Sequence, residues 1–276
     1  MSQSTLIQEH YVIGELSSRL DHALLMSGLA EGPFEWSQLS LVDQFHAQGL
    51  DASKELALAL GAKQGDHILD IGSGLGGPAR FLSAVYGCHV TGIDLTPEYV
   101  EIANRLTKRT GQAEYVTFVQ GDAMHLPFDP ETFDHAWTQH VGMNIEDKDG
   151  FYRGVYRVLK TGGKFAIYDM LKQGDQPILY PVPWARDASY SFVVTPESQQ
   201  KSLEAAGFAV IASVDKTEEA LQSLQAFGKL AQTPNAIPPL NLSVLLGPST
   251  GPMIANMARN IQEGRLQVRQ VIAQKK

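Results

Sequence analysis

The stretch from His67 to Arg80 constrains the fold of this chain more than any other part of it. It reads HILDIGSGLGGPAR, a short apolar run that ends in an acid, followed by glycines at alternate positions and a proline that opens a helical pattern. This order is typical of a β-strand, a glycine-rich turn and a helix. Because such a turn lets a ligand lie against bare backbone at the carboxyl edge of a parallel sheet, the stretch predicts an α/β fold with a ligand site at that edge.

Two classes of cofactor compete for this turn. Gly72, Gly74 and Gly77 satisfy the dinucleotide fingerprint G-x-G-x-x-G, and Asp94 follows at a spacing that suits an acid holding a ribose. The alternating glycines also satisfy the G-x-G-x-G form that binds S-adenosylmethionine. Asp70 favours the second class, because a carboxylate directly before the turn suits an ammonium or sulfonium group and would lie poorly beside a pyrophosphate.

Composition and charge narrow the class of protein. The 276 residues carry a formal net charge of −8, which argues against nucleic acid as the main partner because phosphate binding needs a basic face. No apolar run approaches membrane-spanning length, and the N-terminus lacks the basic and apolar regions of a secretory signal, so we expect a cytoplasmic protein without a membrane span. Cys88 is the only cysteine, which excludes an internal disulfide, and the histidines lack the spacing of a metal site.

Strand and helix patterns alternate along the middle of the chain. The alternation predicts an α/β fold with a Rossmann-like, doubly wound, mostly parallel seven-stranded sheet and a helical lid. The strands expected from the pattern are residues 67–71, 89–94, 116–120, 135–138, 164–169 and 208–215.

Three regions fall outside this alternation. We expect a domain over residues 61–215, preceded by a helical arm at 1–60 and interrupted by an insertion at 172–194 that is rich in Pro, Tyr and Trp. A helical C-terminal extension at 216–276, with a proline-rich break at 233–239, completes the chain. The arm, the insertion and the extension together are expected to build a lid over one site, and they also cover core surface.

Two further acids stand at expected strand ends. Asp94 ends the second strand, where it can accept both hydroxyls of a ribose, with Leu95 beside the ribose and adenine. Asp122 follows the third strand and can accept from an adenine amino group, while the Ala123 N–H donates to a ring nitrogen. Each acid also has a structural alternative: Asp94 can interact with the dipole of the following helix, and Asp122 can be an ordinary turn residue. We favour ligand roles, because three acids at consecutive strand ends, Asp70 included, converge on one crevice.

In this order the motifs resemble those of the class I S-adenosylmethionine-dependent methyltransferases, over roughly residues 40–215. The most similar branch contains the quinone-biosynthesis, sterol and tocopherol methyltransferases and the sarcosine/dimethylglycine N-methyltransferases. The segments that carry the resemblance are residues 70–76, 94, 121–123, 126–128, 133–134 and 157–164. Four segments show a sharper local likeness to bacterial proteins that are grouped with the sarcosine/dimethylglycine enzymes. They are residues 43–46, 137–141, 143–145 and 180–185.

The resemblance implies a set of cofactor-binding residues. They are Asp70, Gly72, Gly74, Asp94, Leu95, Asp122, Ala123 and Gln139. Asp70 and Gly72 would hold the aminocarboxyl end of the cofactor, and Gly74 would allow close approach of the backbone. Gln139, after the fourth strand, would line the methionine moiety.

Polar and aromatic residues in strand-end and lid segments are the candidates for the substrate side. A phenol, hydroxyl or ring carbon must lose a proton on methylation, which His140 or His46 can accept, whereas a neutral amine needs no base. Tyr180 or Trp184 can hold a methylammonium group by a cation–π contact, and Asn144 can bind a polar substrate atom. Each histidine can instead be a hydrogen-bonded structural residue, and Trp184 a packing residue.

We therefore expect S-adenosylmethionine-dependent methyl transfer to a small molecule, in first place N-methylation of a small amine such as sarcosine or dimethylglycine. The alternative is C- or O-methylation of a quinone-, terpenoid- or phenol-like metabolite. Two other classes stay open, an NAD-dependent oxidoreductase and a cofactor-binding protein without catalysis. Asp70 and the Gly-Asp-Ala motif at 121–123 speak against the first, and the polar lid against the second. We expect no metal, because displacement at a sulfonium carbon needs no Lewis acid, and a homo-oligomer stays open.

Overall fold

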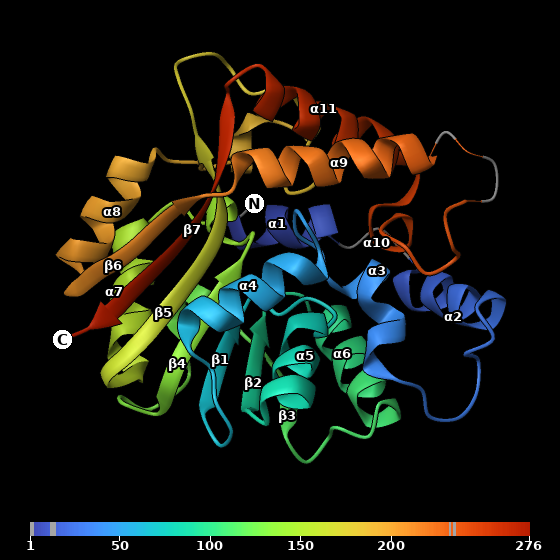
Figure 1. Ribbon diagram of the computed structural model, residues 1–276, viewed down its shortest axis with the longest axis horizontal. Coiled ribbons are helices and arrows are strands. Elements are labelled where there is room, and N and C mark those ends of the chain that lie inside the picture. The colour runs from blue at the N-terminus through green and yellow to red at the C-terminus, as the bar shows by residue number, and fades with distance from the viewer. Residues whose placement is uncertain (1–2, 12–14, 232, 234–235) are drawn as a thin grey trace.

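A computed structural model describes residues 3–11, 15–231, 233 and 236–276, and Figure 1 shows a central sheet flanked by helices. The seven strands lie in the order β3-β2-β1-β4-β5-β7-β6, and all pair in parallel except β7, which is antiparallel to β5 and β6. The strands are β1 His67–Ile71, β2 His89–Asp94, β3 Val116–Gln120, β4 Phe133–Gln139, β5 Leu159–Lys172, β6 Phe208–Asp215 and β7 Leu266–Lys275. This confirms the predicted doubly wound, mostly parallel seven-stranded sheet.

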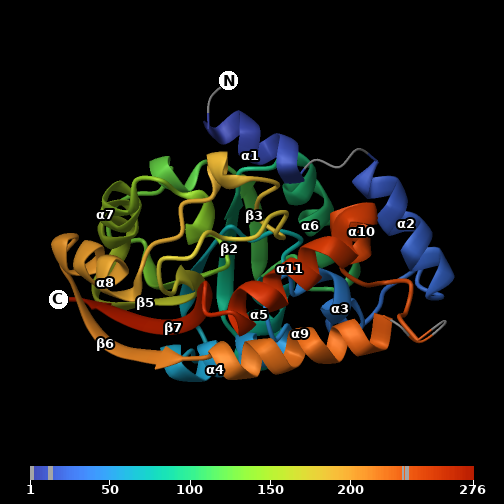
Figure 2. The same ribbon diagram turned by 90° about the horizontal axis from the view of Figure 1, so that it is seen from above.

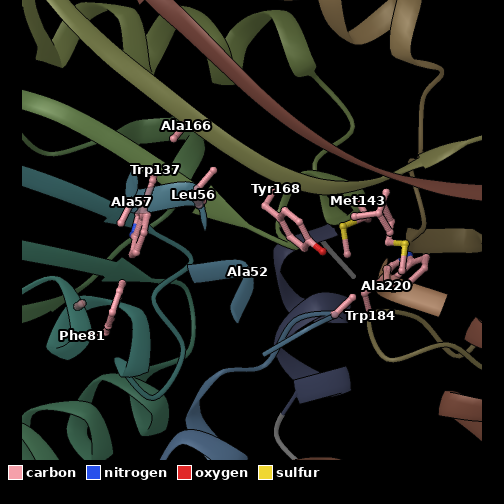
Figure 3. Packing of buried hydrophobic residues seen from close by; sticks show 14 of the residues in the cluster. Ala52, Leu56, Ala57, Phe81, Trp137, Met143, Ala166, Tyr168, Trp184 and Ala220 are labelled. Atoms are coloured by element: carbon pink, nitrogen blue, oxygen red, sulfur yellow. The ribbon is translucent and has the colours of Figure 1, made fainter. Parts of the chain in front are cut away.

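Helices cover both faces of the sheet. On one face α4 and α5 pack against strand residues such as Trp137, which Figure 3 shows close to Leu56 and Ala57. On the other face α7 and α8 form a second core cluster with Leu69 and Phe165. The longer helices are α1 Gln3–Tyr11, α2 Leu16–Met26, α4 Leu50–Leu60, α5 Gly77–Tyr86, α6 Pro97–Arg109, α7 Lys148–Val158, α8 Pro196–Ala205, α9 Thr217–Ala231 and α11 Thr250–Gln262. The short ones are η1 Trp36–Leu39, α3 Ser40–Asp43, η2 Ala123–His125, η3 Gly142–Asn144, η4 Ala188–Tyr190, α10 Ser243–Leu246 and η5 Gly247–Ser249.

The strand order reverses direction between β1 and β4, and this switch point positions the site. From β1 the chain winds outward through β2 to β3, and from β4 it winds the other way to β5. Ligands of open α/β sheets bind at the carboxyl ends of strands beside such a point. The glycine-rich turn that follows β1 lies there, as the sequence predicts.

The helix after β2 shows why the local sequence folds as it does. Thr96 has an extended backbone before Pro97, which occupies the first helical position, where its missing N–H costs nothing. Tyr99, Ile102 and Leu106 are spaced by three and four residues and are buried on one face of α6. The helix therefore packs against β2 and β3 and fixes the backbone that follows Asp94.

One secondary-structure prediction is wrong. The C-terminal extension at 216–276 is not purely helical, because residues 266–275 form β7 between β5 and β6. Its polar side chains hide the strand pattern, yet most of the strand is buried, since other chain segments satisfy several of these groups. Lys275 Nζ donates to the Leu159 carbonyl (2.7 Å) and Gln274 Nε2 to that of Gly162 (3.0 Å). A domain boundary at residue 215 would therefore separate neighbouring strands of one sheet.

The fifth strand is also longer than predicted. Residues 161–163, which precede the strand expected at 164–169, lie inside β5, with Gly162 in the left-handed region (φ 79°). The pairing of β5 with β4 shifts register between Phe133 and His135, which absorbs the irregularity. The strand therefore continues past Gly162 to the carboxyl edge of the sheet.

Helices from both ends of the chain cap this carboxyl edge. Figures 1 and 2 show α9 and α11 side by side over it, and α10 contacts α2 and α3. The insertion at 172–194 joins the cap, because the Leu179 N–H donates to Asn260 of α11 (2.8 Å) and the His10 ring of α1 lies 2.9 Å from the Pro183 carbonyl oxygen.

Parts of the expected arm and extension are not described. Residues 1–2 and 12–14 of the arm, and 232 and 234–235 near the proline-rich break, lie outside the described residues. In the part of the chain that the structure describes, no helix combines the length and the apolar character needed to cross a bilayer.

Candidate active site

A cavity of about 550 Å³ lies between the strand ends and the cap. Every candidate residue named from the sequence lines it, except Tyr180. The acidic wall, on the side of the strand ends, consists of Asp70, Gly72, Ser73, Gly74, Asp94 and Asp122. The apolar wall, on the side of the cap, consists of Ile7, Phe45, Ala47, Met143, Trp184, Leu224, Leu242, Leu245, Ile254 and Met257. The two walls therefore offer different chemistry to a bound molecule.

The glycine-rich turn forms the floor of the acidic wall. Gly72 and Gly74 both have positive φ (72° and 54°), which favours glycine. A Cβ at Gly72 would come within 2.2 Å of Val141 Cγ2, so that position is closed by packing. A Cβ at Gly74 would meet nothing within 4 Å, so this part of the turn offers open backbone to the cavity. The turn therefore exposes its backbone to the cavity at Gly74 and packs against Val141 at Gly72.

Asp94 fixes this turn. Its Oδ2 accepts from the Gly74 N–H (2.8 Å), and its Oδ1 accepts from the Thr96 N–H (2.9 Å). Burial raises the pKa of Asp94, and these two backbone donors oppose that rise. The side chain thus ties the end of β2 to the turn after β1, a role that the sequence did not suggest, while it lines the cavity where a ribose is expected.

Two buried polar atoms of the acidic wall lack a hydrogen-bond partner within the described residues. They are Asp70 Oδ2 and Ser73 Oγ, and both side chains are almost fully buried. Burial raises the pKa of Asp70 to about 7, because the charged form loses its water. A ligand that brings an ammonium group would donate hydrogen bonds to these atoms, and its charge would favour the ionised acid, so the residues fit the S-adenosylmethionine class of ligand better than a pyrophosphate.

Asp122 and its neighbours border the far end of the acidic wall. Asp122 Oδ1 accepts from the Met124 N–H (2.9 Å) and caps η2, so the turn role expected for it is present. Ala123 lies beside it on the cavity surface. Leu95 also lines the cavity, and its carbonyl accepts from Gln8 Nε2 of α1 (2.9 Å), which ties the arm to the strand end.

His46 belongs to a buried polar network that reaches from the arm to β4. Its Nε2 lies 2.9 Å from the Gly49 carbonyl oxygen, 3.2 Å from Ser53 Oγ and 3.1 Å from Gln139 Nε2. The Gly49 carbonyl only accepts and favours a proton on Nε2, whereas the Gln139 amide nitrogen only donates and favours a lone pair there, so the two contacts favour opposite tautomers. Burial lowers the pKa of His46 to about 4, so the imidazole is neutral at physiological pH.

His140 stands opposite His46 in a strained backbone conformation. Its φ is 55°, which is rare for a residue with a side chain, and its ring stacks on Tyr168 with centroids 5.6 Å apart. The rings of His46 and His140 are 6.2 Å apart. Burial lowers the pKa of His140 to about 3, and its Nε2 has no hydrogen-bond partner within the described residues. Both histidines are therefore neutral groups rather than cations.

Asn144 holds the cap together. Its Nδ2 donates to the carbonyl oxygens of Trp184 (2.9 Å) and Tyr190 (3.2 Å), and its Oδ1 accepts from the Tyr11 hydroxyl (2.9 Å). Asn144 therefore positions the insertion and α1 over the cavity, in addition to lining it. Trp184 is buried, and its indole N–H donates to Ser191 Oγ (2.9 Å), so its ring serves both as packing and as cavity wall.

The expected place of Tyr180 needs correction. Its side chain is half-buried among cap residues and does not line the cavity, although it is four residues from Trp184. The backbone between them turns, with Val182 and Ala185 paired by hydrogen bonds, so only the later residues of the segment reach the site.

Sequence reasoning missed most of the apolar wall and one acid. Apart from Trp184, the apolar wall comes from α1, α9, α10, α11, η3 and the loops beside α3 and α10, whose sequences look like ordinary helix faces. Asp43 also lines the cavity and forms a buried ion pair with Arg80 (2.8 Å). It stood inside a motif that carries the local likeness, at 43–46, but no local signal pointed its side chain to the cavity. Within the described residues, no group of three or more His, Cys, Asp or Glu side chains could hold a metal ion.

The chain is similar in sequence to known methyltransferases. The profile of the family described as "Methyltransferase domain" matches residues 69–167. Sterol 24-C-methyltransferase of Saccharomyces cerevisiae is 30% identical over 190 residues, which are 66% of this chain and 49% of that protein. The chain spans less than half the length of the first such relatives.

Two solved structures share the fold. The geranyl diphosphate C-methyltransferase of Streptomyces coelicolor, crystallised with S-adenosyl-L-homocysteine, has a TM-score of 0.73 at 14% identity and covers 100% of this chain and 98% of its own. A Galdieria sulphuraria protein provisionally called a sarcosine dimethylglycine methyltransferase has a TM-score of 0.69 at 17% identity, covering 94% and 98%. Residues 69–167 therefore match a methyltransferase domain, and the chain as a whole shares the fold of these two structures.

Proposed function

We propose that this protein transfers the methyl group of S-adenosylmethionine to an uncharged, largely apolar small molecule, at a hydroxyl oxygen or a carbon. The observation that carries the proposal is the contrast between the two walls of one cavity. The acidic wall suits the cationic cofactor, and the apolar wall gains free energy when it covers an apolar acceptor.

The acidic wall supplies the cofactor contacts in this proposal. Asp70 and the backbone of Gly72 and Gly74 would hold the aminocarboxyl end, Asp94 the ribose, and Asp122 the adenine, with Ala123, Leu95 and Gln139 as lining. When bound, S-adenosylmethionine supplies an electrophilic methyl group on a sulfonium. The protein then needs to hold the acceptor atom in line with that methyl group and to exclude water.

The charges of the lining favour an uncharged acceptor over sarcosine or dimethylglycine. Among the described residues that line the cavity there is no lysine or arginine. A carboxylate-bearing amine would therefore enter without a cationic partner, beside several acids, at a high cost of desolvation. The apolar wall would also remain in contact with water around so small a substrate. C- or O-methylation, the alternative raised by the sequence, is therefore the function that we favour.

His46 is the residue that we propose as general base for such an acceptor. In the tautomer that donates from Nε2 to the Gly49 carbonyl, Nδ1 is left to accept the proton of the acceptor. His140 faces the same space and is the second candidate for this role. Its stacking on Tyr168 also suits it to shape the cavity.

Small-amine N-methylation is the second candidate function. Trp184 lines the cavity and can face a methylammonium group, and Glu146 and Asp147 stand on the same surface. These groups suit a cationic amine that carries no carboxylate.

A panel of acceptors tests the proposal. Formation of S-adenosylhomocysteine would be measured with phenols, quinols and terpenoid alcohols on one side, and with sarcosine, dimethylglycine and simple amines on the other. We expect turnover with the first group. Turnover confined to amines would replace the proposed function by the second candidate, and binding of NAD without binding of S-adenosylhomocysteine would overturn both.

A further inference from the structure

The arm brings a fourth carboxylate to the glycine-rich turn. Asp43 is the last residue of α3, its side chain is 2% exposed, and its Oδ2 lies 2.8 Å from Nη2 of the fully buried Arg80 on α5. Asp43 also lines the cavity. A residue of the arm therefore lines the same cavity as Asp70 and the glycine-rich turn, which the sheet positions.

The close approach of α3 to α5 depends on Gly77. A Cβ at this position would lie 2.5 Å from Asp43 Cγ and from the Asp43 carbonyl oxygen, and 2.6 Å from Asp43 Oδ1. Such distances require something to move. The glycine that opens α5, directly after the turn, is thus what lets the Asp43 carboxylate lie at the end of the turn.

One oxygen of Asp43 has no hydrogen-bond partner within the described residues. Oδ2 is paired with Arg80, but Oδ1 is buried and without a partner, as are Asp70 Oδ2 and Ser73 Oγ on the same cavity. A buried acceptor left in this state is costly. Three such atoms beside one cavity indicate a ligand group with several N–H donors, and a primary ammonium has three.

The charge balance points the same way. Arg80 is the cation that faces these acids, and it also donates to the Leu75 carbonyl (2.6 Å) and to Thr107 Oγ1 (2.9 Å). One guanidinium thus stands near the carboxylates of Asp43 and Asp70, while Asp94 accepts from backbone N–H groups. The excess of acid over base favours a cation in the cavity.

We propose that Asp43 is a cofactor-binding residue, whose Oδ1 accepts a hydrogen bond from the α-ammonium group of S-adenosylmethionine beside Asp70. This rests on the proposed function, since that function supplies the cofactor class. The arm thereby contributes a contact to the cofactor itself, and the aminocarboxyl end of the cofactor joins α3 to the turn after β1.

Two ligands that differ only in this end of the molecule test the proposal. S-adenosylhomocysteine carries the ammonium group, and 5′-methylthioadenosine has the same nucleoside and sulfur without it. In calorimetry, Asp43→Asn should weaken S-adenosylhomocysteine binding by about 10- to 100-fold, the effect of losing a charge-assisted hydrogen bond. Binding of 5′-methylthioadenosine should change by less than about twofold, because no contact with the nucleoside is lost.

Asp51→Asn is the matched control, since Asp51 lies on α4 of the same arm with its side chain 74% exposed and paired with Lys54. It should bind both ligands as the wild type does. Gly77→Ala, which displaces Asp43 without changing its charge, is a second variant and should show the same selective loss. The asparagine of Asp43→Asn keeps one oxygen that can accept from Arg80. The midpoint of thermal unfolding, measured without ligand, reports whether this contact still stabilises the fold.

The outcomes separate this inference from the proposed function. An equal loss for both ligands in Asp43→Asn and in Gly77→Ala would mean that Asp43 acts only through the fold around Arg80, and would overturn the inference. No loss for either ligand would overturn it as well. Failure of the wild type to bind either ligand would instead contradict the proposed cofactor class.

Discussion

The acidic wall and the apolar wall of the cavity are built in different ways. The acidic wall comes from strand ends and the turns that follow them, so its residues keep their places through the hydrogen-bonded ladder of one sheet. The apolar wall comes from helices at both ends of the chain and from the insertion, which meet only in the folded cap. Changes in the cap can therefore alter the acceptor while the cofactor contacts stay unchanged, and four predictions test how separate the two walls are.

The largest effect is expected for the base on the cap side. His46→Asn should lower kcat by roughly 10²–10⁴-fold with a hydroxyl or carbon acceptor, because proton removal then lacks a positioned base. The dissociation constant of S-adenosylhomocysteine should stay within about threefold, since the acidic wall is unchanged. Because burial holds the pKa of His46 near 4, wild-type kcat should stay level between about pH 6 and 8 and fall only in more acidic solution.

His140→Asn is the comparison variant for this prediction. Asparagine tolerates a positive φ, so the backbone at this position is preserved. We expect a smaller loss of kcat than in His46→Asn. The reverse order of the two losses would move the role of base to His140, and a loss of cofactor affinity in either variant would show that the walls are coupled.

The next effect is expected on the acidic wall. Asp94→Ala removes the acceptor of the Gly74 and Thr96 N–H groups as well as the proposed ribose contact, so S-adenosylhomocysteine binding should weaken by about 1–3 kcal/mol. Calorimetry measures this loss. Asp129→Ala, at an exposed loop position, is the control and should bind normally. Unchanged binding in Asp94→Ala would remove Asp94 from the site.

The acidic wall should also make cofactor binding depend on pH. Burial raises the pKa of Asp70 to about 7, and a bound ammonium group favours the ionised carboxylate, so binding releases a proton. Affinity for S-adenosylhomocysteine should therefore increase by about tenfold between pH 6 and pH 8. Asp70→Asn should bind more weakly and lose this dependence. Affinity that falls as the pH rises would contradict a role for Asp70 in holding a cation.

The smallest effect is expected on the apolar wall. Met257→Gln should lower kcat/KM for an apolar acceptor by about five- to tenfold through lost apolar contact, without a change in S-adenosylhomocysteine binding. Met257→Leu keeps the volume and should retain activity. Leu58→Gln, at a position 75% exposed on α4, controls for the added amide. If Met257→Gln raised turnover of small amines instead, the second candidate function would gain support.

The sequence predicted the sheet well where each strand carries its own apolar run. Strands β1, β2, β3 and β6 begin and end at the predicted residues, because each is a short run with apolar and β-branched residues that shows in the local sequence. Strand β7 was missed for the opposite reason. Gln267 and Lys275 donate to carbonyl groups of the neighbouring strand β5, and no local pattern reveals those partners.

In the candidate site, too, the residues with a local sequence signal were predicted and those that depend on distant partners were not. Asp70, Asp94 and Asp122 could be named from the sequence because each ends or follows a strand that leads to one edge of the sheet. The direction of the Asp43 side chain could not, since it depends on Gly77 and Arg80, more than thirty residues away along the chain. Tyr180 was proposed for the site as an aromatic residue of the lid, but its side chain does not line the cavity.

By itself, then, the sequence determined the α/β class, the glycine-rich turn and the three strand-end acids, because these depend on the alternation of short segments and on backbone geometry within a few residues. Only the tertiary structure decided the antiparallel strand β7, the apolar wall and the place of Asp43. These depend on contacts between segments far apart in the chain, where burial and partner choice outweigh local propensity.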